Sequence, residues 1–238
     1  LIIGKRLFQD VATSQPDLIW VNQGDFLGPP ILRRLRTLGV PIVNLINDNP
    51  FSGRDGYRFR LFLQAIAHYD VVAVPRGDNI AAAYKAGARK VVRVWFSADE
   101  AMLPPSDADR ESAAEYRAEV SFIGTWMPER GPFMVELIRR GVPLSIWGDG
   151  WQKAPEWLAL APFWRGPAMY ETDAYCAATR SAKINLGLLS KGNRDLHTRR
   201  SVEIPAIGGL LCPERTAEHL ALYDEGTEAV FLNDAAQC

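Results

Sequence analysis

The sequence predicts an α/β protein built from two units, each containing a parallel β-sheet. Short apolar runs alternate with amphipathic stretches along the chain, which is the pattern of repeated β-α-β units. A polar segment that begins with Pro104 and Pro105 interrupts this alternation, and apolar residues resume at Val120. We therefore expect domains over residues 1–104 and 119–238, joined by a linker over 105–118.

The first unit is predicted to form a small Rossmann-like sheet. Its strands are runs of apolar and β-branched residues, and two of its amphipathic helices end at a glycine, Gly39 or Gly87. In chain order, the expected elements are strand 17–21, helix 29–39, strand 41–46, helix 58–68, strand 70–74, helix 78–86 and strand 90–95.

The second unit is predicted to form another Rossmann-like sheet. Its expected strands are 119–123, 143–147, 183–188, 209–212 and 228–232, and its expected helices are 132–141, 155–160, 172–180, 199–206 and 216–223. In open parallel sheets, ligands sit beyond the carboxyl ends of the strands. We therefore expect a cleft between the two units, lined by loops 47–50, 75–78, 124–131 and 189–199.

Composition argues against several classes of protein. The 27 basic and 28 acidic residues give a formal net charge of −1, so there is no excess positive charge to bind nucleic acid or an anionic membrane. No apolar run approaches the roughly 20 residues that span a bilayer. The cysteines Cys176, Cys212 and Cys238 lie far apart, which predicts neither a disulfide framework nor a paired metal site. A cytoplasmic location is the expectation.

The two ends of the sequence suggest a fragment of a longer protein. The chain opens with Leu1 rather than Met and stops at Cys238, directly after an expected strand.

Three familiar motifs are missing from the sequence. There is no G-x-G-x-x-G after a strand, no G-x-x-x-x-G-K-[ST] and no G-x-S-x-G, which argues against a nicotinamide dehydrogenase, a nucleoside triphosphatase and an α/β-hydrolase.

The strongest local signal runs from Asp195 to Glu203, where a loop with a basic cluster enters a helix. Free backbone N–H groups and the positive end of the helix dipole suit a diphosphate. An acid inside the helix suits the two hydroxyls of a ribose, because one carboxylate can accept two hydrogen bonds. The alternative is structural: Asp195 caps the helix, and Glu203 pairs with Arg199 or Arg200.

This stretch resembles a known family. Asp195 and Glu203 have the spacing of the E-x7-E signature of retaining GT-B glycosyltransferases, with Asp in place of the first Glu, and residues 195–209 look like the CgeB-like family, named for a spore-maturation protein. Supporting segments follow in the expected order at residues 69–75, 85–91, 122–126, 146–151 and 225–230. The resemblance covers nearly the whole chain.

The resemblance implies a GT-B fold and transfer of a hexose from a nucleotide diphosphate sugar to an acceptor hydroxyl, metal-independent and with retained configuration. Family members also carry a C-terminal helix that packs back on the first domain, and this sequence ends before it. By the same resemblance, Glu203 holds the donor ribose, Asp195 faces the sugar hydroxyls, and the loop containing His197 and Thr198 lies against the diphosphate. For His197, a structural hydrogen bond is the alternative.

Further candidates lie in loops at the carboxyl ends of strands. Gly124 and Thr125 follow the first strand of the second unit and are expected to border the donor. Arg130 follows them, and its guanidinium would neutralise charge on the departing diphosphate, unless it is a surface arginine paired with Glu129. Lys191 and Arg194 are further candidates for binding phosphate. The alternative is that they are exposed surface charges without a role in binding.

In the first unit, Asp48 is the candidate acid on the acceptor side. It follows a strand in the sequence Asn47-Asp48-Asn49-Pro50, which equally describes a turn where Asp48 only binds backbone N–H groups. Arg76 is a weaker candidate of the same kind.

Two other functions remain open at this stage. A nucleotide-sugar epimerase on the same fold would also need acids and a histidine near the sugar. A non-catalytic donor-binding module would tolerate the Asp at position 195 and the missing helix. The donor base, the sugar and the acceptor, whether glycan, lipid or protein, are not readable from the sequence. We expect no separate cofactor and no metal.

Overall fold

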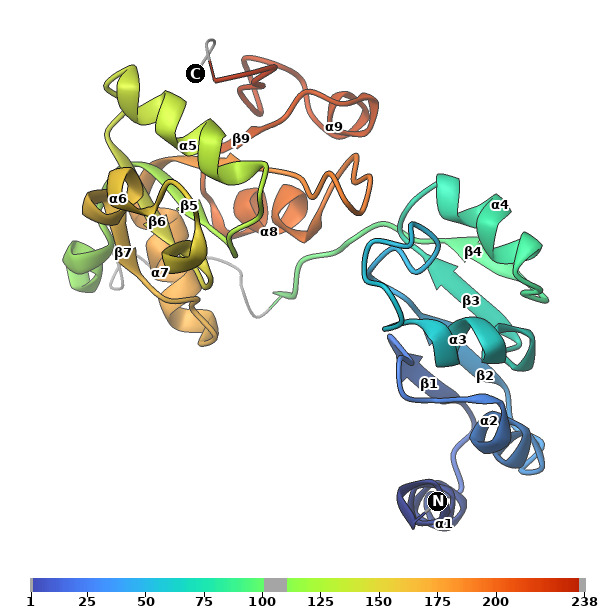
Figure 1. The fold of residues 1–238 in the computed structure, drawn as a ribbon. Coiled ribbons are helices and arrows are strands. Elements are labelled where there is room, and N and C mark those ends of the chain that lie inside the picture. The colour runs from blue at the N-terminus through green and yellow to red at the C-terminus, as the bar shows by residue number, and fades with distance from the viewer. Residues whose placement is uncertain (1, 101–110, 236–238) are drawn as a thin grey trace. The chain divides into compact units, whose positions relative to one another are not determined.

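The structure, a computed structural model, describes residues 2–100 and 111–235 (Figure 1). It divides into two compact units, one formed by Leu1–Trp95 with Gly192–Arg194, and the other by Phe96–Lys191 with Asp195–Cys238. We call them unit 1 and unit 2 and treat each by itself. Each unit contains one sheet, and all strand pairs in both sheets are parallel. The predicted α/β class with two Rossmann-like sheets is confirmed.

The predicted domain bounds stay a prediction. The two units divide between Trp95 and Phe96, upstream of the expected linker. The first part of that linker, residues 105–110, lies outside the described residues. The next residues, Glu111–Tyr116, form a short 3-10 helix that contacts α7 (Thr172–Ser181) in unit 2. The predicted cleft concerns the relative placement of the units and also stays a prediction.

Unit 1 contains a four-stranded sheet whose strand order, β1-β2-β3-β4, follows the chain. Its elements are α1 (Ile2–Ser14), β1 (Ile19–Asn22), α2 (Pro29–Arg36), β2 (Ile42–Leu45), α3 (Arg60–Ala65), a 3-10 helix (Ile66–His68), β3 (Val71–Val74), α4 (Asp78–Lys85) and β4 (Val91–Arg93). Every strand and helix predicted for this unit is present with shifted ends. Helix α1 is an addition that the sequence pattern did not predict.

One face of the unit 1 sheet carries the core. Because neighbouring side chains of a strand point to opposite faces, Ile42 and Val72 face the helices, where they join Leu32 of α2 and Phe62 of α3 in one buried cluster. Consecutive right-handed crossovers in one direction place these helices on the same face. Trp20 of β1 points to the other face and is 57% exposed.

Unit 2 contains a five-stranded sheet with the order β7-β6-β5-β8-β9. Its main elements are β5 (Ala118–Ile123), α5 (Arg130–Arg139), β6 (Leu144–Trp147), a 3-10 helix (Trp151–Lys153), α6 (Trp157–Leu160), a 3-10 helix (Ala161–Phe163), β7 (Trp164–Gly166), α7, β8 (Ala182–Gly187), α8 (Arg199–Ile207), β9 (Leu211–Pro213) and α9 (Ala217–Leu222).

The order of strands in unit 2 reverses between β5 and β8. From β5 the chain first adds β6 and β7 on one side, then returns through α7 to add β8 and β9 on the other side. Such a reversal is a topological switch point, where the loops after the two central strands separate and leave room for a ligand. The chemistry of unit 2 is therefore expected beyond the carboxyl ends of β5 and β8.

Two differences from the predicted elements have physical causes. Strand β7 was missed because its three residues are too short to show a periodic pattern. The predicted strand 228–232 is wrong, since only isolated bridges form there, one between Glu214 and Leu232 and one between Glu225 and Ala229. A turn over residues 224–229, in which the carbonyl of Asp224 accepts hydrogen bonds from the N–H groups of residues 227, 228 and 229, interrupts the start of the segment. Its end lies beside β9, where the N–H groups of Val230 and Leu232 donate to the carbonyls of Leu211 and Pro213.

The core of unit 2 reaches the end of β5 through Trp151. This side chain is completely buried, packs edge-to-face on Phe122 with ring centroids 5.9 Å apart, and donates from Nε1 to the carbonyl of Gly124 at 2.9 Å.

We expect Trp151→Phe to lower the free energy of unfolding of unit 2 by about 1–2 kcal/mol, because a buried carbonyl loses its donor. Chemical unfolding measures this. Trp20→Phe, at an exposed position, is the control. An equal loss of stability in the two variants would contradict a stabilising role for the hydrogen bond of Trp151.

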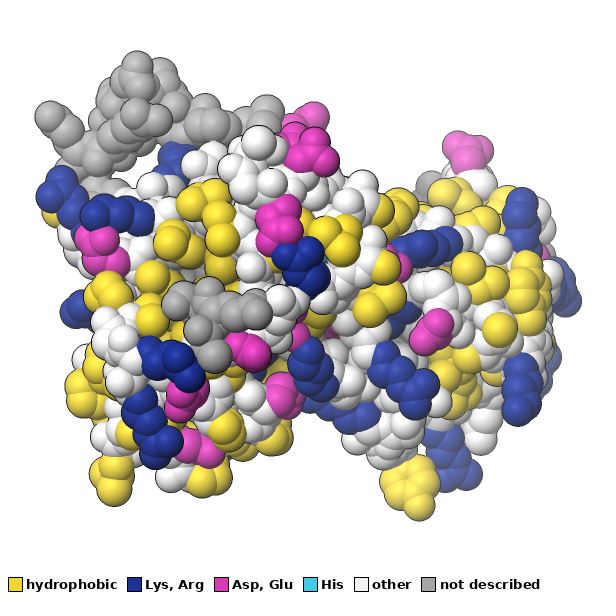
Figure 2. Space-filling view, turned by 90° about the horizontal axis from the view of Figure 1, so that it is seen from above, with side chains coloured by type: hydrophobic (Ala, Val, Ile, Leu, Met, Phe, Trp, Pro, Cys, Tyr) yellow, Lys and Arg dark blue, Asp and Glu magenta, His cyan; other side chains and the backbone are white. Residues whose placement is uncertain are grey.

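On the face drawn in Figure 2, Lys and Arg side chains are interleaved with Asp and Glu over part of the surface, and they outnumber the acidic side chains on the right-hand side of the view. The nearly balanced charges of the whole chain are therefore not evenly distributed over this face. Within residues 2–100 and 111–235, no helix has both the length and the apolar character needed to cross a membrane.

Candidate functional site

Arg130 connects the two loops at the switch point of unit 2. It is the first residue of α5, and only 5% of it is exposed. Its Nη1 donates to the carbonyl of Thr125 after β5 at 2.7 Å, and its Nη2 donates to the carbonyls of Leu188 and Leu189 after β8 at 3.2 and 3.3 Å. The guanidinium therefore holds both loops together. Its positive charge lies against the backbone carbonyls of these loops.

This charge is retained at neutral pH. Burial lowers the pKa of Arg130 to about 10, with nearby Arg200 acting in the same direction. The buried Nε has no hydrogen-bond partner among the described residues. Arg130 is thus not the solvated surface arginine of the alternative reading, and it does not line the pocket described below. Its proposed role toward the leaving group stays a prediction.

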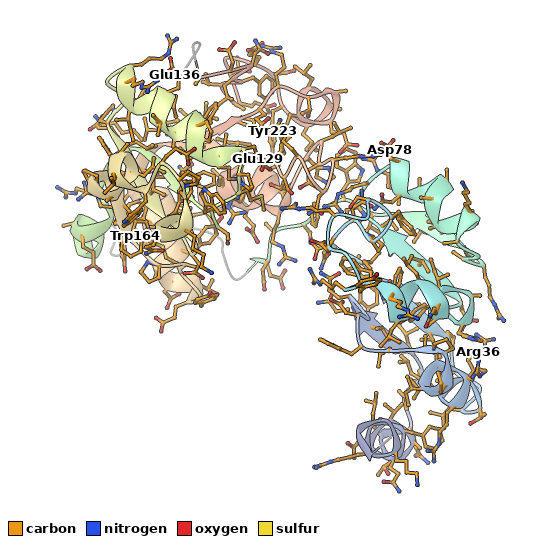
Figure 3. All side chains as sticks on the ribbon, viewed as in Figure 1. Arg36, Asp78, Glu129, Glu136, Trp164 and Tyr223 are labelled. Atoms are coloured by element: carbon orange, nitrogen blue, oxygen red, sulfur yellow. The ribbon has the colours of Figure 1, made fainter. Side chains whose placement is uncertain are left out.

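Carboxylates fix the backbone of the loop that follows β8. Asp195, only 9% exposed, accepts a hydrogen bond from the N–H of Ser190 at 3.3 Å. Glu129, which immediately precedes α5 (Figure 3), accepts one from the N–H of Lys191 at 3.1 Å. Lys191 in turn pairs through Nζ with Glu214. In this structure Asp195 and Lys191 both stabilise the loop, and their contacts with a donor stay predictions.

A pocket of about 240 Å³ opens within unit 2. Three parts of the chain form its wall: the end of β5, the segment from the loop after β7 into α7, and the first turns of α8. The lining residues are Ile123, Gly124, Thr125, Ala168, Met169, Tyr170, Glu171, Thr172, Tyr175, Arg199, Arg200 and Glu203. Three of the predicted donor residues, Gly124, Thr125 and Glu203, therefore share one pocket wall.

Glu203 is the buried acid of this pocket. It is 7% exposed, and its Oε2 accepts a hydrogen bond from the Tyr175 hydroxyl at 3.4 Å. The Nε of Arg199 lies 3.8 Å from its Oε1, too far for a close ion pair. Burial raises the pKa of Glu203, and this outweighs the lowering by Arg199, Arg200 and the tyrosine hydroxyl. Its carboxylate is incompletely compensated by the protein.

Arg200 and Gly124 meet where α8 approaches the end of β5. The Nε of Arg200 donates to the carbonyl of Ile123 at 2.5 Å. A Cβ added to Gly124 would lie 2.8 Å from the ring of Phe122 and 3.4 Å from Nη2 of Arg200. Only glycine therefore fits here without moving the ring of Phe122. Together, Arg199 and Arg200 give the pocket two positive charges at the start of α8.

His197 is engaged inside unit 2. It is 2% exposed; its Nδ1 lies 2.5 Å from a carboxylate oxygen of Glu218, and its Nε2 accepts a hydrogen bond from the N–H of Phe96 at 3.3 Å. Both ring nitrogens therefore bind protein groups, as in the structural alternative. A contact with phosphate stays a prediction and would require one of these bonds to break. Thr198 is the N-cap residue of α8, and its N–H donates to the Ser201 hydroxyl at 2.9 Å.

Two remaining candidates belong to unit 1. Asp48 accepts hydrogen bonds at 3.0 Å from the side-chain amide of Gln23 and from Nη1 of Arg58. Arg194, in the short segment that groups with unit 1, has a left-handed φ of 56°. Neither placement tests the acceptor-side and phosphate roles, which stay predictions. The weaker candidate Arg76 is buried and donates to the carbonyl of Asn47 at 2.6 Å.

Part of the pocket was not predicted from the sequence. Tyr175 was one residue of an expected helix, Arg200 was considered only as a partner of Glu203, and the segment 168–172 was given no role. Their only sequence signal was the position of 168–172 before a predicted helix. Among the described residues, no group of three or more His, Cys, Asp or Glu side chains is placed to hold a metal ion.

The chain is similar to known proteins in its fold and, over part of its length, in its sequence. Residues 130–238, somewhat less than half of the chain, match the model of the family described as glycosyl transferase-like. No curated protein matches the sequence significantly. Solved structures match over nearly the whole chain.

The structure of Anabaena HepE in complex with UDP-glucose is 12% identical, with a TM-score of 0.67 over 98% of this chain and 69% of that one. For α,α-trehalose 6-phosphate synthase from Burkholderia multivorans the identity is 17% and the TM-score 0.60, over 99% of this chain and 65% of the other. Sucrose-phosphate synthase from Thermosynechococcus elongatus is 10% identical, with a TM-score of 0.64 over 98% and 65%. The chain thus spans about two thirds of the length of these proteins.

The fold is therefore that of the GT-B glycosyltransferases, with two parallel-sheet Rossmann-like domains. Within that class, the part of the chain from Arg130 onward, which carries Glu203 and α8, is glycosyl transferase-like in sequence. The finer resemblance to the CgeB-like family stays a prediction.

Proposed function

We propose that this protein is a glycosyltransferase that moves a hexose from a nucleotide diphosphate sugar to an acceptor hydroxyl. One observation carries the proposal: a buried, incompletely compensated carboxylate, Glu203, shares a pocket of about 240 Å³ with Arg199 and Arg200 at the start of α8. Ligand hydroxyls would supply the hydrogen bonds that this carboxylate lacks. The two guanidiniums and the N-terminal end of the helix suit a diphosphate.

The donor lies in unit 2 in this proposal. Its ribose hydroxyls donate to Glu203, and its diphosphate lies toward Arg199, Arg200 and the start of α8. The positive charge of Arg130 acts through the loops that it holds, where it opposes the charge that develops as the glycosidic bond breaks. These three arginines support a metal-independent reaction, because they provide the positive charge that the leaving diphosphate needs.

We further propose retention of the anomeric configuration, as the Asp195 to Glu203 spacing suggests. In such a reaction the leaving phosphate can take the proton of the acceptor hydroxyl. No separate base on the protein is then required. The acceptor, whether glycan, lipid or protein, would be selected elsewhere than in the donor pocket.

A panel of nucleotide sugars tests the function directly. The purified chain is incubated with each donor, with and without simple sugar acceptors and with EDTA, and nucleoside diphosphate and sugar products are followed by NMR. Release of nucleoside diphosphate that depends on the acceptor and persists in EDTA is the expected result. An epimerised sugar without transfer would instead identify an epimerase, and binding of nucleoside diphosphate without turnover in the full-length protein would identify a binding module.

Donor binding should depend on pH through Glu203. The ionised carboxylate accepts both ribose hydroxyls, whereas the protonated form has lost part of its acceptor capacity. Because burial raises the pKa of Glu203, protonation begins at a higher pH than for an ordinary glutamate. We therefore expect the affinity for nucleoside diphosphate to fall as the pH drops toward this raised pKa. Calorimetry across pH measures it, and Glu203→Gln should remove this dependence.

A further inference from the structure

Tyr170 is an aromatic side chain that borders the pocket and yet is 85% exposed. It lies in the loop between β7, marked by Trp164 in Figure 3, and α7. Exposed rings occur elsewhere on this protein, so what distinguishes Tyr170 is its place on the wall of the pocket. A ring fixed at the edge of a pocket presents a flat apolar surface to a planar ligand group.

One residue, Asp149, fixes this ring in place. Its Oδ2 accepts a hydrogen bond from the Tyr170 hydroxyl at 2.5 Å, and its Oδ1 accepts one from the N–H of Ala168 at 3.0 Å. The tyrosine hydrogen bond lowers the pKa of Asp149, and the same bond raises the pKa of Tyr170, so the bonded protonation states hold at neutral pH. The contact joins residues 21 positions apart in the sequence.

The backbone around Asp149 is itself constrained. Asp149 sits between two glycines with left-handed backbone angles, Gly148 with φ of 144° and Gly150 with φ of 80°. The carbonyl of Asp149 accepts a hydrogen bond from the N–H of Trp126 at 2.9 Å, which ties this turn to the loop after β5. The ring of Tyr170 is therefore positioned by a rigid turn at the end of β6 rather than by its own loop alone.

We infer that Tyr170 forms the stacking wall for the nucleobase of the donor, with Asp149 as its positioning residue. The inference rests on the proposed function. Glu203 and the two arginines occupy the α8 side of the pocket, which suits ribose and diphosphate. The rest of the wall is formed by the end of β5, the first turn of α7 and the loop with Ala168, Met169 and Tyr170. Tyr175 of α7 is already bonded to Glu203, so Tyr170 is the ring that can face the base, the planar part of the donor.

Variants of the two residues separate stacking from folding. Tyr170→Ala should weaken binding of the tightest of UDP, ADP and GDP by about five- to tenfold, because one face of the base loses its aromatic partner. It should leave competition by inorganic pyrophosphate, which has no base, unchanged. Tyr170→Phe keeps the ring but loses its anchor, and should retain most of the affinity. Asp149→Asn should show the same small, base-dependent loss.

The control is Tyr57→Ala, which removes an equally exposed aromatic ring, 87% exposed, from unit 1. If the parent protein binds none of the three nucleotides, the proposed function fails. If the parent binds one of them and Tyr170→Ala binds it equally well, the stacking wall is refuted while the function stands. A matching loss for pyrophosphate would also refute it, since Tyr170 would then only shape the loop.

Discussion

Replacing Arg130 with alanine is expected to reduce the turnover number by about a hundredfold or more at saturating donor. The guanidinium carries a positive charge behind the loops after β5 and β8, where negative charge would develop on the departing diphosphate. That charge matters most when the glycosidic bond breaks and less in the ground state. Affinity for nucleoside diphosphate should therefore change by only a few-fold. Steady-state kinetics and calorimetry on the same variant measure the two effects separately.

The same change also removes three hydrogen bonds to backbone carbonyls, two of them buried, so folding must be measured alongside. We expect the free energy of unfolding to fall by about 2–4 kcal/mol. Arg140→Ala is the matched control, because Arg140, which directly follows α5, is exposed and pairs with Glu136 of that helix. A folded Arg130→Ala variant with normal turnover would show that Arg130 only holds the loops. Equal losses of nucleotide binding and rate would lead to the same conclusion.

Replacing Glu203 with alanine should act on binding instead. If two charge-assisted hydrogen bonds to ribose are lost, donor affinity falls by about 1–3 kcal/mol, which is about five- to 150-fold. These contacts exist before and during bond breaking, so turnover at saturating donor can survive. Calorimetry with a nucleoside diphosphate gives the affinity, and kinetics at high donor concentration gives the rate. Unchanged affinity in Glu203→Ala would place the donor elsewhere.

Glu203→Gln distinguishes lost binding from lost folding. In the folded protein the pKa of Glu203 lies above its unfolded value, so the charged form is disfavoured there. The stability linked to this group is complete below the unfolded pKa and is lost as the pH rises through the folded pKa. At neutral pH, ionisation of Glu203 therefore lowers the free energy of unfolding of the protein without ligand. We expect Glu203→Gln to raise the unfolding temperature slightly at pH 7 while it weakens donor binding.

Much of the fold could be predicted because most helices and strands have a recognisable pattern of apolar residues in the sequence. Buried parallel strands appear as short apolar runs, and helices such as α5 and α8 appear as amphipathic stretches with clear ends. The prediction failed where this pattern is absent or where apolar residues do not form a strand. The residues of β7 are too few, and the apolar residues near Val230 contact β9 only after a turn that begins at Asp224, so they form isolated bridges and no strand.

The pocket residues that could be predicted lie either in one continuous stretch, as Glu203 does, or directly after a predicted strand, as Gly124 and Thr125 do. The stretch from Asp195 to Glu203 contains both the loop and the helix start, so it was found. Tyr175 and Tyr170 come from segments that the fold brings to the same pocket, and residue type alone does not mark them. Asp195 and His197 show the opposite case. Their chemistry attracted a functional prediction, whereas in the structure each already binds backbone or side-chain groups of unit 2.

The glycine at position 148 limits how donor preference can change. A Cβ at Gly148 would lie 2.0 Å from the carbonyl oxygen of Gly124, so the backbones after β5 and β6 touch and leave no room for any side chain. Variation at this contact would move the pocket wall itself. The loop at 168–172, by contrast, lines the pocket and contains no glycine. Divergence toward a new donor, in nature or in a directed library, should therefore accumulate at 168–172 while position 148 remains glycine.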